Sequence, residues 1–392
     1  MKIAILTSGI LPIPAVQGGA VENLIDFYLE YNDRHRLHDI TVYSVRHPNV
    51  YRHPALRSSV NHYVHIDTRS LLARLSAKIY SLFHRDECYY YQIEYFFEQA
   101  YKRLRKQSFD LIVLENRPGY ALKLSKRLTT PIVSHMHTNQ LFEPTPQNKA
   151  IIRSTTRFLT VSAYLKREIE SVGLPADISI VYNGLDAALF HRSQVTPVSR
   201  ASLGFSPDDF VAVFCGRLVP DKGIKELLQA FLLLKDQPKA KLMVLGSSEF
   251  ANSSQSNDFI RELRQMAGQL SGRIAFTGFV PYTQIPSYLA VADVSVVPSH
   301  INEAFGMTCI EACAMGLPVI ATNDGGIPET LIGQKHILVD KSNRLPQQLA
   351  DALLHVKEHL PKYQGNTLPQ SFTKTAYAET FFGQLSIPTE SS

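Results

Sequence analysis

Short runs of apolar and β-branched residues alternate along this chain with longer amphipathic stretches. This alternation is typical of βαβ units, in which helices join parallel strands. In the first half we expect helices such as Val21–Arg34 and Tyr89–Lys106, the latter packed although its end is basic. The strands expected there are Lys2–Thr7, Ile40–Val45, Tyr63–Ile66, Leu111–Leu114, Ile132–His135, Phe158–Val161 and Ile178–Val181.

The pattern breaks at residues 191–206, which include Pro197 and show no strong periodicity, and then starts again. We interpret this break as a linker between two lobes. The second series of expected strands is Val211–Cys215, Leu242–Leu245, Ile274–Thr277, Val294–Val297, Pro318–Ala321 and Ile337–Val339. The helices expected between them are Ile224–Leu234, Asp258–Leu270, Thr283–Val291, Met307–Met315 and Leu345–Val356.

The length of the chain also favours two lobes. At 392 residues it is too long for one ordinary hydrophobic core. We therefore predict an α/β protein with two Rossmann-like, doubly wound parallel sheets, one in residues 1–190 and one in residues 191–370. A last amphipathic helix at about residues 371–386 carries several aromatic residues, and it could pack back on the N-terminal lobe.

Composition and charge narrow the class of protein. Hydrophobic residues make up 45% and charged residues 19%, as in soluble globular proteins, and no stretch approaches the roughly 20 apolar residues of a membrane-spanning helix. The N-terminus reads as a buried strand and not as a signal peptide. We expect a cytoplasmic protein, with association at the membrane left open.

Charge is unevenly spread between the two halves. Residues 1–190 contain 23 lysines and arginines against 17 acidic residues, whereas residues 191–392 contain 17 against 18. A basic half favours an anionic partner, such as a lipid phosphate or the inner face of the membrane. Nucleic acid is not expected, because no nucleic-acid motif accompanies the charge. An ordinary solvated surface is the simple alternative.

Ligands of open parallel sheets bind at the carboxyl ends of the strands. After the first strand, Gly18 and Gly19 open a helix, where they would let a ligand approach the amides at its positive end. A plain flexible turn explains this pair equally well. The GxGxxG fingerprint is absent, which argues against a nicotinamide oxidoreductase.

The loop after the first strand of the second lobe is more informative. Arg217 and Lys222 bracket a turn there, and a helix follows directly. The planar fork of arginine and the point charge of lysine suit a diphosphate. The loop does not fit a Walker A motif, and two solvated surface cations remain the simple alternative.

A third candidate lies after the fourth strand of the second lobe. The amides of Gly306, Met307 and Thr308, at the start of a predicted helix, could hold a phosphate. Glu311 would point back toward the same ligand and could accept hydrogen bonds from two ribose hydroxyls. Glu303 could accept hydrogen bonds from sugar hydroxyls. An acid favoured by the helix dipole and an ordinary helical glutamate are the alternative.

Together these motifs resemble the family-4 retaining glycosyltransferases of GT-B fold. The likeness covers nearly the whole chain and is strongest over residues 210–332. It implies two Rossmann-like lobes that face each other across a cleft. In the second half it rests on Gly216-Arg217-Leu218 with Lys222-Gly223, on Glu303 and Glu311 with seven residues between them, on the string from Glu311 to Ala321, and on Gly325-Gly326-Ile327-Pro328-Glu329. In the first half it rests on Gly18-Gly19, Thr160-Val161-Ser162 and Tyr182-Asn183-Gly184-Leu185-Asp186.

The resemblance also implies roles for single residues. The donor nucleotide would bind the second lobe and the acceptor the first. Arg217 and Lys222 match the positions that grip the diphosphate, and Gly19 matches a glycine whose amide lies beside the phosphate. Glu311 matches the ligand of the ribose, and Glu303 matches the acid that contacts the donor sugar.

A histidine after a first-lobe strand contacts the transferred sugar in similar proteins. Two histidines fit here, His135 and His137. We favour His137, because polar residues follow it as in those proteins, and His135 is the alternate. Without the resemblance, either side chain would more often be a buried structural residue.

The expected activity is a retaining transfer of a sugar from a nucleotide diphosphate sugar, with a UDP-sugar favoured because such donors are common in the family. The acceptor would be a glycan or a lipid-linked molecule in the synthesis of bacterial surface polysaccharide or glycoconjugate. Cations and helix-end amides would stabilise the leaving diphosphate. No D-x-D sequence is present, so we expect no metal ion, and no cofactor besides the donor.

Two alternatives stay open. One is a sugar-nucleotide epimerase of the same fold. The other is a catalytically silent relative that binds glycan or nucleotide as a coat or assembly component. The intact set of Arg217, Lys222, Glu303 and Glu311 favours catalysis.

Overall fold

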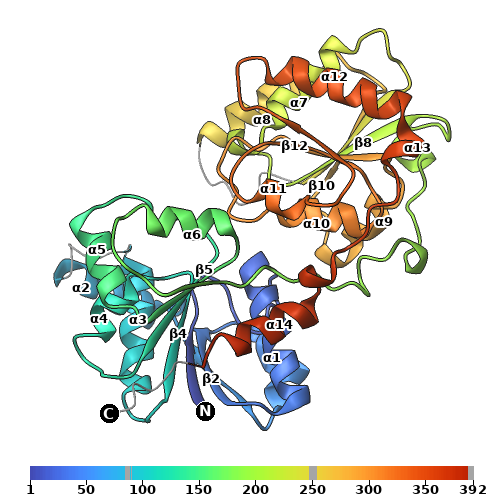
Figure 1. Ribbon diagram of the computed structural model, residues 1–392. Helices are drawn as coiled ribbons and strands as arrows, with labels where there is room; N and C mark the ends of the chain where they lie inside the picture. Colours follow the sequence, from blue (N-terminus) through green and yellow to red (C-terminus); the bar gives the residue numbers. More distant parts are fainter. Residues whose placement is uncertain (84–88, 90, 247–253, 387–392) are drawn as a thin grey trace. The chain divides into compact units, whose positions relative to one another are not determined.

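The structure is a computed structural model that describes residues 1–83, 89, 91–246 and 254–386 (Figure 1). Its contacts divide the chain into two compact units. Unit 1 comprises Met1–Gly184 and Lys374–Ser392, and unit 2 comprises Leu185–Thr373. The sequence had suggested a boundary at residues 190 and 191.

Unit 1 is built on a seven-stranded sheet in which all neighbouring strands are parallel. Its strand order is β3-β2-β1-β4-β5-β6-β7. The strands are β1 (Lys2–Leu6), β2 (Asp39–Val45), β3 (Asn61–Ile66), β4 (Leu111–Glu115), β5 (Ile132–Met136), β6 (Arg157–Thr160) and β7 (Ile178–Ile180). The helices are α1 (Ala20–His35), α2 (Leu71–Phe83), α3 (Tyr91–Leu104), α4 (Tyr120–Leu124), α5 (Pro146–Arg153), α6 (Ala163–Glu170) and α14 (Lys374–Gly383).

The sheet of unit 1 separates two hydrophobic clusters, because successive side chains of a strand point to opposite faces. On one face Ile3 and Ile5 pack with residues of α1 and α14. On the other face Ala4 and Leu6 pack with residues of α3 and α4. Both faces of β1 are therefore buried, which explains why its sequence is a continuous apolar run.

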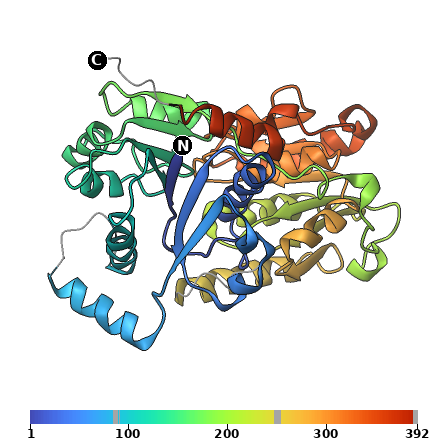
Figure 2. The ribbon, with the colours of Figure 1, turned by 90° about the horizontal axis from the view of Figure 1, so that it is seen from below.

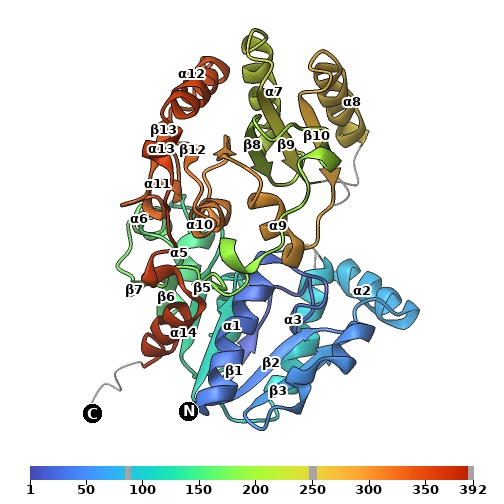
Figure 3. The same cartoon turned by 90° about the vertical axis from the view of Figure 1, so that its right-hand side faces the viewer.

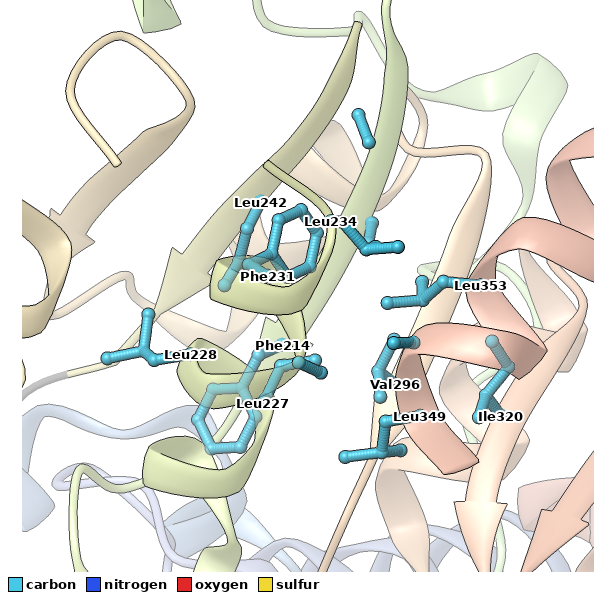
Figure 4. Close-up of a cluster of buried hydrophobic side chains, with 14 of the residues drawn as sticks. Phe214, Leu227, Leu228, Phe231, Leu234, Leu242, Val296, Ile320, Leu349 and Leu353 are labelled. Carbon is cyan, nitrogen blue, oxygen red and sulfur yellow. The ribbon is translucent and has the colours of Figure 1, made fainter. Parts of the chain in front are cut away.

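Unit 2 repeats this design with six parallel strands in the order β10-β9-β8-β11-β12-β13. The strands are β8 (Phe210–Cys215), β9 (Ala240–Leu245), β10 (Ile274–Gly278), β11 (Val294–Val297), β12 (Val319–Thr322) and β13 (His336–Val339). The helices are α7 (Ile224–Leu233), α8 (Ser254–Gly268), α9 (Ile285–Leu289), α10 (Met307–Ala314), α11 (Ile327–Thr330), α12 (Leu345–Glu358) and α13 (Leu360–Tyr363). Figure 4 shows part of the core, in which Phe231 of α7 and Leu353 of α12 lie over strand residues such as Val296.

The predicted class of fold, two Rossmann-like parallel sheets with helices, is confirmed. Most strands match their expected ranges within one or two residues. One expected helix, Thr283–Val291, is instead a 3-10 turn at Tyr282–Gln284 followed by α9, because Pro286 lacks the amide needed inside a continuous helix and occupies the first turn of α9. In the part of the chain that the structure describes, no helix has both the length and the apolar character needed to cross a bilayer.

In both sheets the strand order reverses beside the first strand, between β1 and β4 in unit 1 and between β8 and β11 in unit 2. Crevices at such switch points, outside the carboxyl ends of the strands, are where ligands of doubly wound sheets bind. We therefore expect ligand-binding residues in the loops after these four strands.

Candidate active site

The loop after β8 packs directly on the loop after β11. Gly223 begins α7 with a φ of +70°, and a Cβ atom there would lie 1.8 Å from the carbonyl oxygen of Pro298. Real Cβ atoms do not approach an oxygen this closely, so only glycine fits. This contact brings Lys222, the residue before Gly223, to the carboxyl end of β11.

Lys222 forms an ion pair with Glu303, which lies on the loop after β11. The hydroxyl of Ser299 donates a second hydrogen bond, 2.6 Å long, to the same carboxylate oxygen of Glu303. Both charged side chains are about four-fifths buried, with exposed fractions of 21% and 18%. Two residues 81 positions apart that the sequence had singled out separately are thus in contact.

Two glycines hold the backbone of the Glu303 loop. The amide of Gly326 donates to the carbonyl of Glu303 at 2.7 Å. A Cβ atom at Gly325 would lie 2.3 Å from that same carbonyl oxygen, and one at Gly326 would lie 2.5 Å from the carbonyl oxygen of Ala304. The Gly325-Gly326 motif therefore works by close backbone contact, which fixes the backbone position of Glu303.

Helix α10 begins next to this loop, after Gly306 with a φ of +109°. The N-cap residue is a glycine without a side chain to cap the first turn, and the amides near Met307 and Thr308 lie at the positive end of the helix. Such an end is suited to bind a phosphate. These positions are those that the sequence had assigned to phosphate binding.

Glu311 lies on α10 and is buried, with an exposed fraction of 6%. Burial raises the pKa of its carboxyl group to about 7, although a hydrogen bond with Tyr282 opposes the shift. Burial and the charge of Glu311 also raise the pKa of the Cys215 thiol, which places Glu311 near the end of β8. Sequence reasoning missed Tyr282, since no motif marks it.

Arg217 is exposed and follows Cys215 in the loop after β8. Together with Cys215, Gly246 and Phe279, it lines a cavity of about 170 Å³. Unit 2 therefore brings two of the predicted groups to the end of β8, Arg217 by this cavity and Glu311 by its proximity to Cys215. The Lys222–Glu303 pair lies at the end of the neighbouring strand, β11.

In unit 1 the two candidate histidines converge on a carboxylate that the sequence analysis did not select. The parallel register places Glu115, the last residue of β4, opposite His135 of β5. Nδ1 of His135 lies 3.3 Å from one carboxylate oxygen of Glu115, and Nε2 of His137 lies 2.9 Å from the other. The side chains of all three are buried, with exposed fractions of 2% or less.

Two groups of this buried cluster, Glu115 and His137, have strongly shifted pKa values. The two histidines lower the pKa of Glu115 to about 2, outweighing the effect of burial, which alone would raise it. Burial and the neighbouring His135 lower the pKa of His137 to about 4. At neutral pH the site thus contains a glutamate anion that accepts hydrogen bonds from a neutral His137.

Helix α14 supports this cluster from the far end of the chain. The hydroxyl of Tyr28, on α1, donates to Glu115 at 3.0 Å. The ring of Tyr28 stacks on Phe381 of α14, with ring centroids 4.2 Å apart. The ring of Phe381 also lies 5.4 Å from that of His135. Figures 1 and 3 show α14 beside α1.

The backbone after β5 is fixed by Asn116, which has a positive φ of +56°. Its side-chain oxygen accepts hydrogen bonds from the amides of His137 and Thr138. The ring orientation of His137 is thus set by Glu115 and its backbone by Asn116. Glu115 ends β4 and Asn116 directly follows it, so only the pairing of β4 with β5 brings these two residues to the histidine.

Gly18 and Gly19 both have positive φ, and Gly19 precedes the first turn of α1. A Cβ atom at Gly19 would lie 2.2 Å from the carboxylate of Glu22, so this side chain lies over the amide end where we expected a ligand. Burial raises the pKa of Glu22, and the charge of Glu115 raises it further, while Arg117 lowers it. Glu22, which lies beside Gly19, thus interacts electrostatically with Glu115 of the histidine cluster.

Among the described residues, one group of side chains has the geometry to hold a metal ion. The ligand atoms of Glu115, His135 and His137 all lie within 4.8 Å of one another. Here the carboxylate accepts hydrogen bonds from Tyr28 and from both imidazoles.

The three cysteines that the structure describes, Cys215, Cys309 and Cys313, are free thiols.

Comparisons with known proteins match this architecture. The profile of the family Glycosyltransferase Family 4 matches residues 29–189, and that of Glycosyl transferases group 1 matches residues 195–367. Over 367 residues the chain is 30% identical to "Putative glycosyltransferase YtcC" of Bacillus subtilis, with 90% of this chain and 82% of that protein covered. It is 26% identical to Spore coat protein SA of the same organism over 97% of each.

Among solved structures, that of Anabaena Alr3699/HepE in complex with UDP and glucose has a TM-score of 0.72, with 22% identity and with 98% and 99% of the two chains covered. Sucrose-phosphate synthase from Thermosynechococcus elongatus has a TM-score of 0.74, with 19% identity and 98% of each chain covered. These solved structures share the fold of two parallel sheets, and the two family profiles together with the relative of 30% identity show that the chain is a glycosyltransferase of GT-B fold. Within that class the chain belongs to glycosyltransferase family 4.

Proposed function

We propose that this protein is a retaining, metal-independent glycosyltransferase that uses a UDP-sugar as its donor. Its acceptor is a glycan or a lipid-linked molecule in the synthesis of surface polysaccharide or glycoconjugate. It works in the cytoplasm, with peripheral contact to the inner face of the membrane. Unit 2 binds the donor and unit 1 the acceptor.

The Lys222–Glu303 pair is the observation that carries this proposal. It is a partly buried ion pair beside the positive end of α10, and its loops are fixed by glycine contacts. A diphosphate bound at α10 would meet Lys222, and Glu303 would remain to accept hydrogen bonds from the sugar hydroxyls. Arg217 would supply a second cation as negative charge develops on the leaving group.

The remaining groups fit the same reaction. Glu311 is a buried carboxylate suited to the two hydroxyls of a ribose. In unit 1, Nε2 of His137 is committed to Glu115, whereas Nδ1 makes no hydrogen bond with the residues that the structure describes. We assign this nitrogen to the transferred sugar. Gly18 and Gly19 admit the phosphate to the amides of α1 once Glu22 moves aside.

Names of similar proteins support the donor and the acceptor class. The Alr3699/HepE structures contain UDP, or UDP-glucose. Over 233 residues the chain is 30% identical to the Lipopolysaccharide 1,2-N-acetylglucosaminetransferase of Salmonella typhimurium, with 59% of each protein covered. We take these likenesses as support for a UDP-sugar donor and a surface-glycan acceptor.

A thermal-shift screen with UDP-, GDP-, dTDP- and ADP-sugars tests the donor. A ligand at about 100 times its dissociation constant stabilises its target by roughly 2.7 kcal/mol, so the correct nucleotide should raise the melting temperature by several degrees. We expect the shift with UDP-sugars and its loss in Lys222→Ala. A shift with GDP- or ADP-sugars alone would contradict the proposed donor.

The likeness to Spore coat protein SA over 97% of each chain favours a second candidate, a glycan- or nucleotide-binding coat component. Incubation with a radiolabelled UDP-sugar and a cell-envelope extract separates the candidates. A transferase labels a product only when acceptor is present. An epimerase changes the sugar without acceptor, and a coat component binds the nucleotide without turnover.

A further inference from the structure

Helix α2 carries a row of exposed aliphatic side chains. Ala73 and Ala77 are buried, and α3 is the helix that packs against α2. In Figure 2, where α2 is light blue, and in Figure 3, the helix lies at the edge of unit 1. Five of its aliphatic residues are 50% to 83% exposed, namely Leu71, Leu72, Leu75, Ile79 and Leu82.

These exposed residues share one face. Successive residues of a helix are rotated by about 100°, so all five lie within an arc of about 100°, opposite the two buried alanines. A helix of a globular protein normally turns such a stripe toward the core. Here the stripe is left outside, which marks it as a surface for another partner.

The charges of α2 indicate which partner this is. Arg74 and Lys78 flank the apolar arc on one side, and the helix contains no acidic residue. A helix with leucines on one face and cations beside them is the pattern that lies in the interface of an anionic lipid bilayer. A protein partner that covered this face would need acidic residues of its own next to an apolar groove.

A cavity beside α2 adds a second observation. It measures about 430 Å³, and its lining includes Arg69 and Arg74 together with Gly9 and Ile10, which follow β1. Two guanidinium groups near the end of the leucine face would meet phosphates at headgroup depth. The cavity also opens at the carboxyl edge of β1, the side of the sheet where the proposed acceptor binds.

We propose that α2 docks unit 1 on a bilayer that contains anionic lipids, with Leu71, Leu75 and Leu82 among the acyl chains and Arg69 and Arg74 at the phosphates. This docking deepens the proposed function, because it brings unit 1 to a lipid-linked acceptor. It requires neither the donor nor catalysis.

Flotation of the full-length protein with vesicles tests the docking. We expect binding to vesicles of phosphatidylcholine with about one-third phosphatidylglycerol, weaker binding to pure phosphatidylcholine, and further weakening by salt. The triple variant Leu71→Ser/Leu75→Ser/Leu82→Ser should weaken the binding at least about tenfold. Each substitution removes apolar surface that would insert into the bilayer. The fold should persist, because these side chains are exposed in the native protein.

A matched control is Leu233→Ser/Ile332→Ser, which removes exposed apolar residues of unit 2 and should bind vesicles like the wild type. Failure of the wild-type protein to float, or equal binding by the triple variant, would overturn the proposal. So would a wild-type dimer in light scattering that the triple variant converts to monomer without any vesicle binding. UDP-sugar binding, followed by thermal shift in the same variants, reports on the proposed function separately.

Discussion

Nε2 of His137 donates a hydrogen bond to Glu115 across 2.9 Å, in a site where both side chains are buried. The carboxylate fixes the tautomer and the orientation of the ring, which leaves Nδ1 for a ligand. Tyr28 donates a hydrogen bond to Glu115, and its ring stacks on Phe381 of α14. The position of this histidine therefore depends on residues more than 200 positions apart in the chain.

This cluster makes the protein sensitive to acid. The pKa of His137 is about 4 in the folded protein, against about 6.5 when the chain is unfolded, so the unfolded state binds more protons between these values. The contribution of His137 to the free energy of unfolding should therefore fall as the pH drops from about 6.5 to 4, by at most about 1.4 kcal/mol per pH unit. The lowered pKa of Glu115 adds a further loss below about 4.5.

Urea unfolding of wild type and His137→Gln at about pH 7 and pH 5 isolates this contribution: the stability of the wild type relative to the variant should be lower at pH 5 than at pH 7, because only the wild type carries the titrating ring. Exposed His62 offers a control, since its side chain is about half accessible and His62→Gln should leave the difference between the two pH values unchanged. Equal loss in His137→Gln and wild type would show that the ring does not titrate as described.

Removal of either proposed diphosphate cation should slow catalysis strongly. Lys222→Ala and Arg217→Ala each delete a charge-assisted contact that grows in the transition state, worth on the order of 2–4 kcal/mol, or about 30- to 1000-fold in kcat. The measurement is turnover of the donor identified by thermal shift. Near-normal activity in both variants would rule out this diphosphate site.

Lys239 provides the control for these variants. It also belongs to unit 2 and pairs with a carboxylate, Asp208, but both side chains are more than three-fifths exposed. Lys239→Ala should leave kcat unchanged, and circular dichroism should show that all three variants keep the native secondary structure.

Binding of the donor should depend on the protonation of Glu311. Because its pKa is raised to about 7, this carboxyl group is largely neutral at pH 6 and largely charged at pH 8. A charged carboxylate accepts stronger hydrogen bonds from ribose hydroxyls. We therefore expect UDP-glucose, whose diphosphate ester does not titrate in this range, to bind more tightly as the pH rises from about 6 to 8.

Calorimetric titrations at the two pH values give the comparison, with Glu311→Gln as the variant that should bind weakly and lose the pH dependence. Stability of the ligand-free protein should change in the opposite direction. The folded protein holds the proton of Glu311 more tightly than the unfolded chain does, so this contribution is lost as the pH rises through 7. A pH dependence that survives in Glu311→Gln would assign it to another group.

The contact between Gly223 and Pro298 should be intolerant of any side chain. Gly223→Ala must displace the loop after β11, because its Cβ would lie 1.8 Å from a carbonyl oxygen. Gly204 is a matched control: its φ of +76° is close to the +70° of Gly223, but nothing lies within 4 Å of its Cβ position. Gly204→Ala should cost only the 1–2 kcal/mol or so of a left-handed backbone.

Urea unfolding should show a larger loss for Gly223→Ala than for Gly204→Ala, together with weaker donor binding only in the former. If both variants lose the same stability, the close contact contributes nothing beyond the backbone conformation.

The sequence by itself determined the two sheets, because alternation of buried strands with helices is a local pattern that each segment carries in its own residues. It also determined the candidate site residues of unit 2. These are Arg217, Lys222, Glu303 and Glu311, which follow strands and helix starts at fixed spacing. These features depend on neighbours within a few positions along the chain, and such neighbours are visible in the sequence.

Only the tertiary structure decided which of these groups meet. Glu115 contacts His135 and His137 because β4 pairs with β5 in one register, and Lys222 contacts Glu303 because Gly223 lets one loop pack on another. The same holds for α2: its amphipathic pattern marks a helix with an apolar face, and only packing shows that the alanines point inward. Contacts between distant segments depend on how the whole chain is packed, which no local pattern records.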